Sequence, residues 1–236
     1  MKLIEKNKDQ IVFDAEIEEG LANAIRRYVN HIPIFAIDEL EISRNDSPLY
    51  DETIAHRVGL IPLKMDGVSE KTKVKLSVKK EGIVYSESIK GAEIVYKEIP
   101  ITTLDKGQEL EFTATLKFGR GEEHAKFTPG LMFYRNYAEI TMDKEFIDDV
   151  KKILPDVEIK EKGGKIVLID NNKKEITDVL EGLTQKAKKK AEVALGKNLI
   201  ITVESFGQMD VKEVFKESLE ALRKDLNSVA KAVEKS

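Results

Sequence analysis

Two glycine-containing segments of this 236-residue chain are the first candidates for chemistry. GRGEEH at 119–124 begins like a dinucleotide-binding loop, because Gly119 and Gly121 match the first two glycines of that fingerprint. His124 stands at the third glycine position and no helical pattern follows, so we predict a turn in which both glycines have positive φ angles. GGK at 163–165 lacks the frame of a phosphate-binding loop and predicts a hairpin turn.

Metal, redox and nucleophilic chemistry have little support in the sequence. The chain has no cysteine, which excludes disulfides, thiolate nucleophiles and iron–sulfur clusters, so we expect no cofactor. Its histidines (His31, His56 and His124) lack the HExxH spacing of a zinc site, and no GxSxG motif is present. Adjacent carboxylates point to different faces of a helix or strand. We therefore interpret three such pairs as solvated surface: Asp51–Glu52, Glu122–Glu123 and Asp148–Asp149.

Two further groups of polar residues have ordinary structural explanations. His56 lies in the amphipathic segment 51–63 (DETIAHRVGLIPL), and we interpret it as a structural histidine rather than a catalytic base. A cluster of lysines could contact phosphate but is expected on the solvated face of a helix: Lys186, Lys188, Lys189 and Lys190. No convincing active site follows from these residues.

Composition narrows the class of protein further. Charged residues make up 35% of the chain, against roughly 25% in typical proteins, and the net charge is −4. A free-standing binder of duplex DNA usually carries a basic footprint, which the whole chain lacks. The first residues (MKLIEKNKDQIVFD) do not resemble a signal peptide, and no apolar run approaches a membrane span. We expect a soluble, cytoplasmic protein.

The periodicity of apolar residues predicts a mixed α and β protein. Alternation predicts a strand at 10–17, helical spacing predicts a helix at 19–31 that Pro33 ends, and alternation resumes at 34–44. The region from about 50 to 142 is rich in strands. Its longest alternating segment has a predicted inward set of Leu110, Phe112, Ala114, Leu116 and Phe118.

The pattern changes after Met142. We predict a short helix at 145–154, a turn and strand at 163–170, and a helix at 174–195 that ends at Gly196. A strand at 198–205 then leads into the final helix.

The final helix is expected to begin at Asp210, with Glu213 at capping-box spacing. Its apolar residues follow a heptad pattern: Phe215, Leu219, Leu222, Leu226, Val229 and Val233. Such a helix is longer than a small sheet can cover. We therefore expect a partner to bury at least part of this stripe.

Three segments have a distinctive order of residues: 21–63, with NAIRR, AID and DETIAHRVGLIPL; 119–130 (GRGEEHAKFTPG); and 203–226. Together they resemble one family, the α-type assembly subunits of multisubunit RNA polymerases. The resemblance is strongest to its archaeal members, the counterparts of the eukaryotic third-largest subunit, although Phe127 stands where the family usually has Trp.

The resemblance implies an α+β fold with a discontinuous dimerisation domain, made of a sheet and two amphipathic helices. Residues 1–45 and 197–236 would form it, and 46–142 would form a β-rich inserted domain. Residues 143–196 would be a degenerate ferredoxin-like insertion, because the cysteines that bind a cluster in many archaeal members are missing.

The resemblance also implies an architectural role without a catalytic site. The chain would pair with the small subunit L, and the pair would nucleate assembly of the large subunits with the small subunits N and P. Nucleotidyl transfer would occur on the largest subunit, and neither a membrane nor a specific DNA sequence would be contacted.

The two predicted amphipathic helices and the 51–63 motif give the expected site residues. We expect a dimer interface at Leu21, Ile25, Tyr28, Val29, Phe215, Leu219, Leu222, Leu226 and Val229. Contacts to a large subunit are expected at Arg26, Arg27, Asp51, Glu52, His56 and Arg57. One of the two adjacent arginines could instead pair with Asp38 or Glu39, and segment 51–63 could act only within its own domain.

Two alternatives remain open at this point. The chain could be a stand-alone α+β enzyme with an unrecognised site, or a homodimer of the bacterial α type. Replacing Leu222 or Ile25 by aspartate is expected to abolish pairing with L, because either change would bury an unpaired charge.

Overall fold

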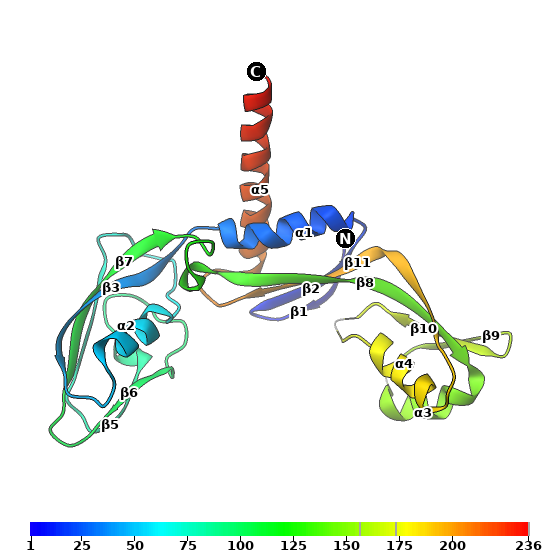
Figure 1. The fold of residues 1–236 in the computed structure, drawn as a ribbon, viewed down its shortest axis with the longest axis horizontal. Coiled ribbons are helices and arrows are strands. Elements are labelled where there is room, and N and C mark those ends of the chain that lie inside the picture. Colours follow the sequence, from blue (N-terminus) through cyan, green and yellow to red (C-terminus); the bar gives the residue numbers. More distant parts are fainter. Residues whose placement is uncertain (156, 173, 236) are drawn as a thin grey trace. The chain divides into compact units, whose positions relative to one another are not determined.

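The structure is a computed structural model that describes residues 1–155, 157–172 and 174–235. Within these residues the chain is a mixed α and β protein with sheets of six, three and two strands (Figure 1). It divides into two compact units. The first unit joins Met1–Asn23 to Met132–Thr202, and the second joins Ala24–Leu131 to Val203–Ser236.

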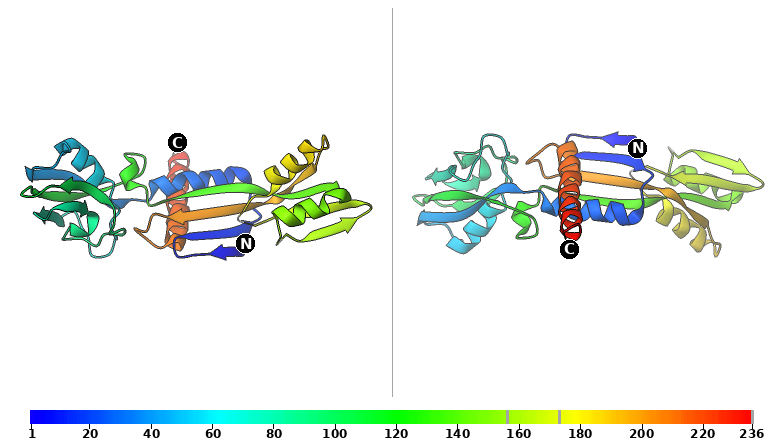
Figure 2. Two further views of the ribbon diagram at one scale, coloured as in Figure 1. Left: turned by 90° about the horizontal axis from the view of Figure 1, so that it is seen from below. Right: turned by 90° about the horizontal axis from the view of Figure 1, so that it is seen from above.

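The first unit is organised by a six-stranded sheet with the order β1-β2-β11-β8-β10-β9. Figure 2 shows β11 lying between β2 and β8, so strands from opposite ends of the sequence are neighbours. The strands are β1 (Lys2–Lys6), β2 (Gln10–Ala15), β8 (Gly130–Asp143), β9 (Ile159–Lys162), β10 (Lys165–Asp170) and β11 (Glu192–Ser205). Both chain ends therefore contribute to this sheet.

Two helices complete the first unit, α3 (Ile147–Ile153) and α4 (Thr177–Lys186). They share a core with β8 and β10 that includes Phe146, Val150, Ile166, Leu168 and Leu180. Gly163 and Gly164 have positive φ angles in the turn between β9 and β10, which confirms the hairpin predicted there.

The helix predicted at 174–195 is wrong beyond Lys186. The backbone of Lys188 has φ 58°, which ends the helical conformation, and β11 begins at Glu192. Gly196 is not a helix cap. A Cβ at Gly196 would lie 2.6 Å from the ring of Tyr137, so glycine allows close approach within the sheet. Alanines at helical spacing suggested a helix, but alanine is small enough to fit either element.

The second unit contains the three-stranded sheet β3-β7-β4, the pair β5-β6, helix α2 and the long helix α5. Helix α1 (Glu19–Tyr28) crosses from the first unit into the second. The remaining bounds are β3 (Ile34–Asn45), α2 (Asp51–Gly59), β4 (Lys73–Val78), β5 (Gly82–Tyr85), β6 (Pro100–Leu104), β7 (Leu110–Gly119) and α5 (Val211–Val233).

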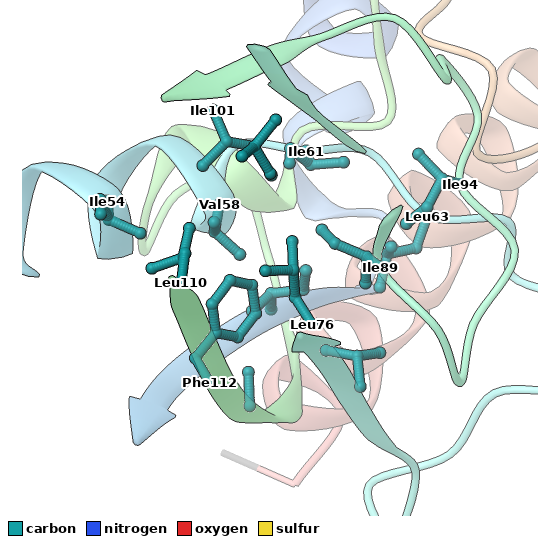
Figure 3. Packing of buried hydrophobic residues seen from close by; sticks show 14 of the residues in the cluster. Ile54, Val58, Ile61, Leu63, Leu76, Ile89, Ile94, Ile101, Leu110 and Phe112 are labelled. Carbon is teal, nitrogen blue, oxygen red and sulfur yellow. The ribbon is translucent and has the colours of Figure 1, made fainter. Parts of the chain in front are cut away.

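The core of the second unit lies between α2 and the sheet. Figure 3 shows Ile54 and Val58 of α2 near Leu110 and Phe112 of β7 and Leu76 of β4. The inward set predicted for β7 is confirmed for its first members: Leu110, Phe112, Ala114 and Leu116.

Phe118, the last member of that predicted set, is exposed instead. Its ring lies 4.8 Å from the ring of Phe35, its partner in the register of β3 and β7. The two rings form a cross-strand aromatic pair in which Phe35 is partly buried against the core and Phe118 is exposed.

The two compact units divide the chain at other positions than the domains predicted from the sequence. The predicted boundaries at 142/143 and 196/197 fall inside β8 and β11, two strands of 14 residues each. Residues 143–196 thus share a sheet with the N-terminal strands. The three-domain division remains a prediction.

Helix α5 begins as expected, with the carboxylate of Asp210 accepting a hydrogen bond of 2.8 Å from the amide of Lys212. Asp210→Ala is expected to lower the free energy of unfolding by about 1 kcal/mol, because the cap would be lost. Urea denaturation followed by circular dichroism measures this change. Asp210→Asn keeps a capping oxygen and should remain close to the parent chain. Equal losses in both variants would contradict the capping role.

Among the helices of the described residues, none is both long and apolar enough to span a lipid bilayer.

Candidate functional site

The apolar side of helix α5 is buried only in its first turns. Val211, Val214 and Ser218 are completely buried there. At about 100° of rotation per residue, the predicted heptad stripe overlaps this buried side, since Val229 lies about five full turns beyond Val211. Every residue from Arg223 to Val233 is exposed, so the stripe is uncovered where α5 continues past the contacts of its first turns.

The heptad stripe becomes more exposed toward the end of the chain. Phe215 and Leu222 are half-buried, whereas Leu219 is 37% exposed, Leu226 60% and Val229 61%. Val233 continues this exposed run. Single exposed apolar side chains are ordinary, but a row of them along one helix face is typical of a surface that binds another protein.

The interface residues predicted on α1 and in the turn that follows it differ in their exposure. Leu21 is 47% exposed, whereas Ile25 is 3% exposed and Val29 is also buried. Ile25 and Val29 are thus covered by the chain itself, and their place in an interface remains a prediction.

Tyr28 connects the end of α1 to α5. Its hydroxyl donates a hydrogen bond of 3.0 Å to the Asp225 carboxylate, and this bond raises the pKa of Tyr28. The Tyr28 ring stacks on His31 with 4.3 Å between ring centroids, and His31 pairs with Glu122 at 2.6 Å. These contacts join α1, the 119–124 loop and α5 within the second unit.

The shape of the 119–124 loop depends on space rather than on backbone angle. Gly119 and Gly121 do not have the positive φ angles that we predicted. A Cβ at Gly119 would lie 2.7 Å from the Phe127 ring, and one at Gly121 would lie 3.2 Å from the Asn30 Cα. Glycine is therefore needed so that the loop can approach these residues closely.

Segment 51–63 places its polar residues on the surface of α2. Asp51, Glu52, His56 and Arg57 are all exposed. Asp51 accepts a hydrogen bond of 2.7 Å from the side chain of Asn45, and Arg57 donates one of 2.9 Å to the carbonyl of Ile101. Asp51 and Arg57 thus help to hold α2 in place, while their contact with another subunit remains a prediction.

Arg26 and Arg27 are both exposed in the last turn of α1. Asp38, one of the partners considered for them, forms its ion pair with Lys126 at 2.5 Å. Sequence reasoning missed this pair and the His31–Glu122 pair, because both join positions about 90 residues apart.

A metal centre finds no support in the described part of the chain. No group of three or more histidine, aspartate or glutamate side chains among those residues could hold a metal ion. The lysine cluster also differs from its prediction. Lys188 to Lys190 follow α4 rather than lie on it, and Lys189 pairs with Asp143 and Glu145.

Comparison with known proteins agrees with the resemblance seen in the sequence. Residues 40–132 match the family described as the RNA polymerase Rpb3/RpoA insert domain. The chain is 33% identical to the DNA-directed RNA polymerase subunit Rpo3 of Pyrococcus horikoshii, over 94% of this chain and 93% of the relative. It is 32% identical to the same subunit of Thermococcus kodakarensis (94% and 92%) and 30% identical to that of Methanothermobacter thermautotrophicus (94% and 94%). The chain therefore belongs to the archaeal family of α-type subunits of DNA-directed RNA polymerase.

Proposed function

We propose that this chain is a non-catalytic assembly platform of a DNA-directed RNA polymerase and that it forms a heterodimer with the small subunit L. The observation that carries the proposal is the exposed heptad stripe of α5. Membership of the Rpo3 family supports a role within the polymerase, and the stripe supplies a surface for pairing.

The energetics of the stripe favour a partner. Burying a leucine or valine side chain is worth roughly 1.5–3 kcal/mol before the costs of association. Leu219, Leu226, Val229 and Val233 all retain exposed area that a partner helix could cover. Leu21 of α1 also keeps exposed apolar area, and we assign it to the interface with L as well.

The heterodimer would then bind the large subunits through other surfaces. We assign this contact to the exposed residues of α2, above all Glu52 and His56, and to Arg26 and Arg27 of α1. The small subunits N and P would join the same assembly. Catalysis would occur on the largest subunit, in the cytoplasm, and this chain would hold no iron–sulfur cluster because it has no cysteine.

Co-expression with the L subunit of the same organism tests the proposal. Purification through a tag on L, followed by light scattering, should give the mass of a complex with one copy of each chain. The isolated chain should be measured beside it. A stable homodimer of the isolated chain that does not bind L would instead support the bacterial α type of assembly. A monomer that neither binds L nor enters the polymerase would contradict the proposal.

A further inference from the structure

A groove of about 750 Å³ lies in the second unit beside α5, on a different side of the helix from the heptad stripe. We call it the α5 groove. Ile32, Pro33 and Ala221 give it an apolar lining, and Ser228 is a second small residue along its helical wall. A segment of extended chain could therefore approach the helix closely at Ala221 and Ser228.

The α5 groove lies among contacts that join the end of α1, the 119–124 loop and α5. The stacked Tyr28 and His31 rings, the Tyr28–Asp225 hydrogen bond and the His31–Glu122 pair fix its walls relative to one another. Close packing of Gly121 against Asn30 fixes the loop that brings Arg120 to the groove. The groove is thus formed before any ligand binds.

Positive charge dominates the lining. Arg120, Arg223, Lys224 and Lys231 line the groove together with Glu217 and Glu220. Arg223 lies 3.9 Å from Glu220, but the ion pairs recorded among the described residues include none for Arg120, Lys224 or Lys231. Arg120, Lys224 and Lys231 are therefore three positive charges beside an apolar lining, and none of them forms an ion pair within the described residues.

We infer that the α5 groove binds an acidic segment of the partner subunit, with carboxylates near Lys224, Lys231 and Arg120 and an apolar side chain against Ile32 and Pro33. The inference rests on the proposed function, because the same helix carries the pairing stripe. A protein segment is favoured over nucleic acid, because its apolar side chains can fill the lining at Ile32, Pro33 and Ala221, which a phosphate backbone cannot do.

The test is the dissociation constant of the heterodimer with L, measured by fluorescence anisotropy at several salt concentrations. Reversing two charges together, Lys224→Glu with Lys231→Glu, is expected to raise the dissociation constant roughly tenfold near 0.1 M salt. The difference should shrink as salt rises, because added ions screen the attraction in the parent complex. Arg120→Glu, on another element, should act in the same direction.

The matched control is the double variant Lys212→Glu with Lys216→Glu, which changes the charge of α5 equally outside the groove lining. It should bind L like the parent chain. Groove variants that bind L as this control does would overturn the inference, and so would variants that lose affinity only for a fluorescent DNA probe. If Leu226→Asp still prevents pairing in that case, the proposed function stands. If the parent chain does not bind L at all, the proposed function itself fails.

Discussion

Leu226→Asp is expected to weaken association with the L subunit by at least about 100-fold while leaving the isolated chain folded. Leu226 is 60% exposed in the chain alone, so the new carboxylate stays hydrated there. In the heterodimer it would be buried without a counter-charge, which costs about 3 kcal/mol or more. Co-purification and anisotropy measure the loss of pairing, and circular dichroism shows whether the fold is retained.

Leu195→Asp is the matched control for this prediction. Leu195 is 68% exposed on β11, so the same substitution is made at a leucine of similar exposure that is outside the heptad stripe. It should pair with L normally. Normal pairing of Leu226→Asp would show that the stripe is not the interface.

The structure also changes which variants can test pairing. Ile25→Asp would place a charge at a side chain that is 3% exposed, so its effect would combine unfolding with any loss of pairing. Leu222 is half-buried, so an aspartate there would also destabilise the isolated chain to some extent. Leu226 and Val229 separate the two effects because the chain itself leaves them exposed.

Arg135→Met is expected to lower the free energy of unfolding by about 3–5 kcal/mol, because it leaves a buried carboxylate without its counter-charge. Asp170 is 1% exposed, and one of its oxygens accepts a hydrogen bond of 2.7 Å from Arg135. The other oxygen accepts hydrogen bonds from the amides of Ile176 and Thr177 and from the Thr177 hydroxyl, at the start of α4. Urea denaturation of the full chain measures the loss.

Two further variants separate this effect from a general loss of surface charge. Lys189→Met removes a cation from the solvent-exposed pair with Asp143 and should leave stability close to that of the parent chain. Adding Asp170→Asn to Arg135→Met should recover part of the stability, since asparagine keeps an acceptor for Thr177 without the buried charge. A double variant no more stable than Arg135→Met would contradict this explanation.

Local features of this protein could be predicted from its sequence because each depends on neighbouring residues. Alternation placed Leu110, Phe112, Ala114 and Leu116 on the buried side of β7, since side chains of a strand alternate between faces. Heptad spacing and Asp210 predicted the long final helix and its start. The family resemblance could also be recognised from the sequence, because it depends on the order of residues in segments such as 51–63.

Only the tertiary structure decided which of these features the chain covers for itself. Leu21 and Ile25 belong to one helical pattern, yet one is exposed and the other buried, because burial depends on what packs against the helix. The burial of Asp170 likewise depends on a distant residue, because its partner Arg135 is 35 positions away. At residues 192–196 the spacing of alanines suited a helix, but pairing with neighbouring strands made this segment part of β11. Contacts between distant segments have no local pattern, so periodicity predicted the α5 stripe but could not show how much of it remains exposed.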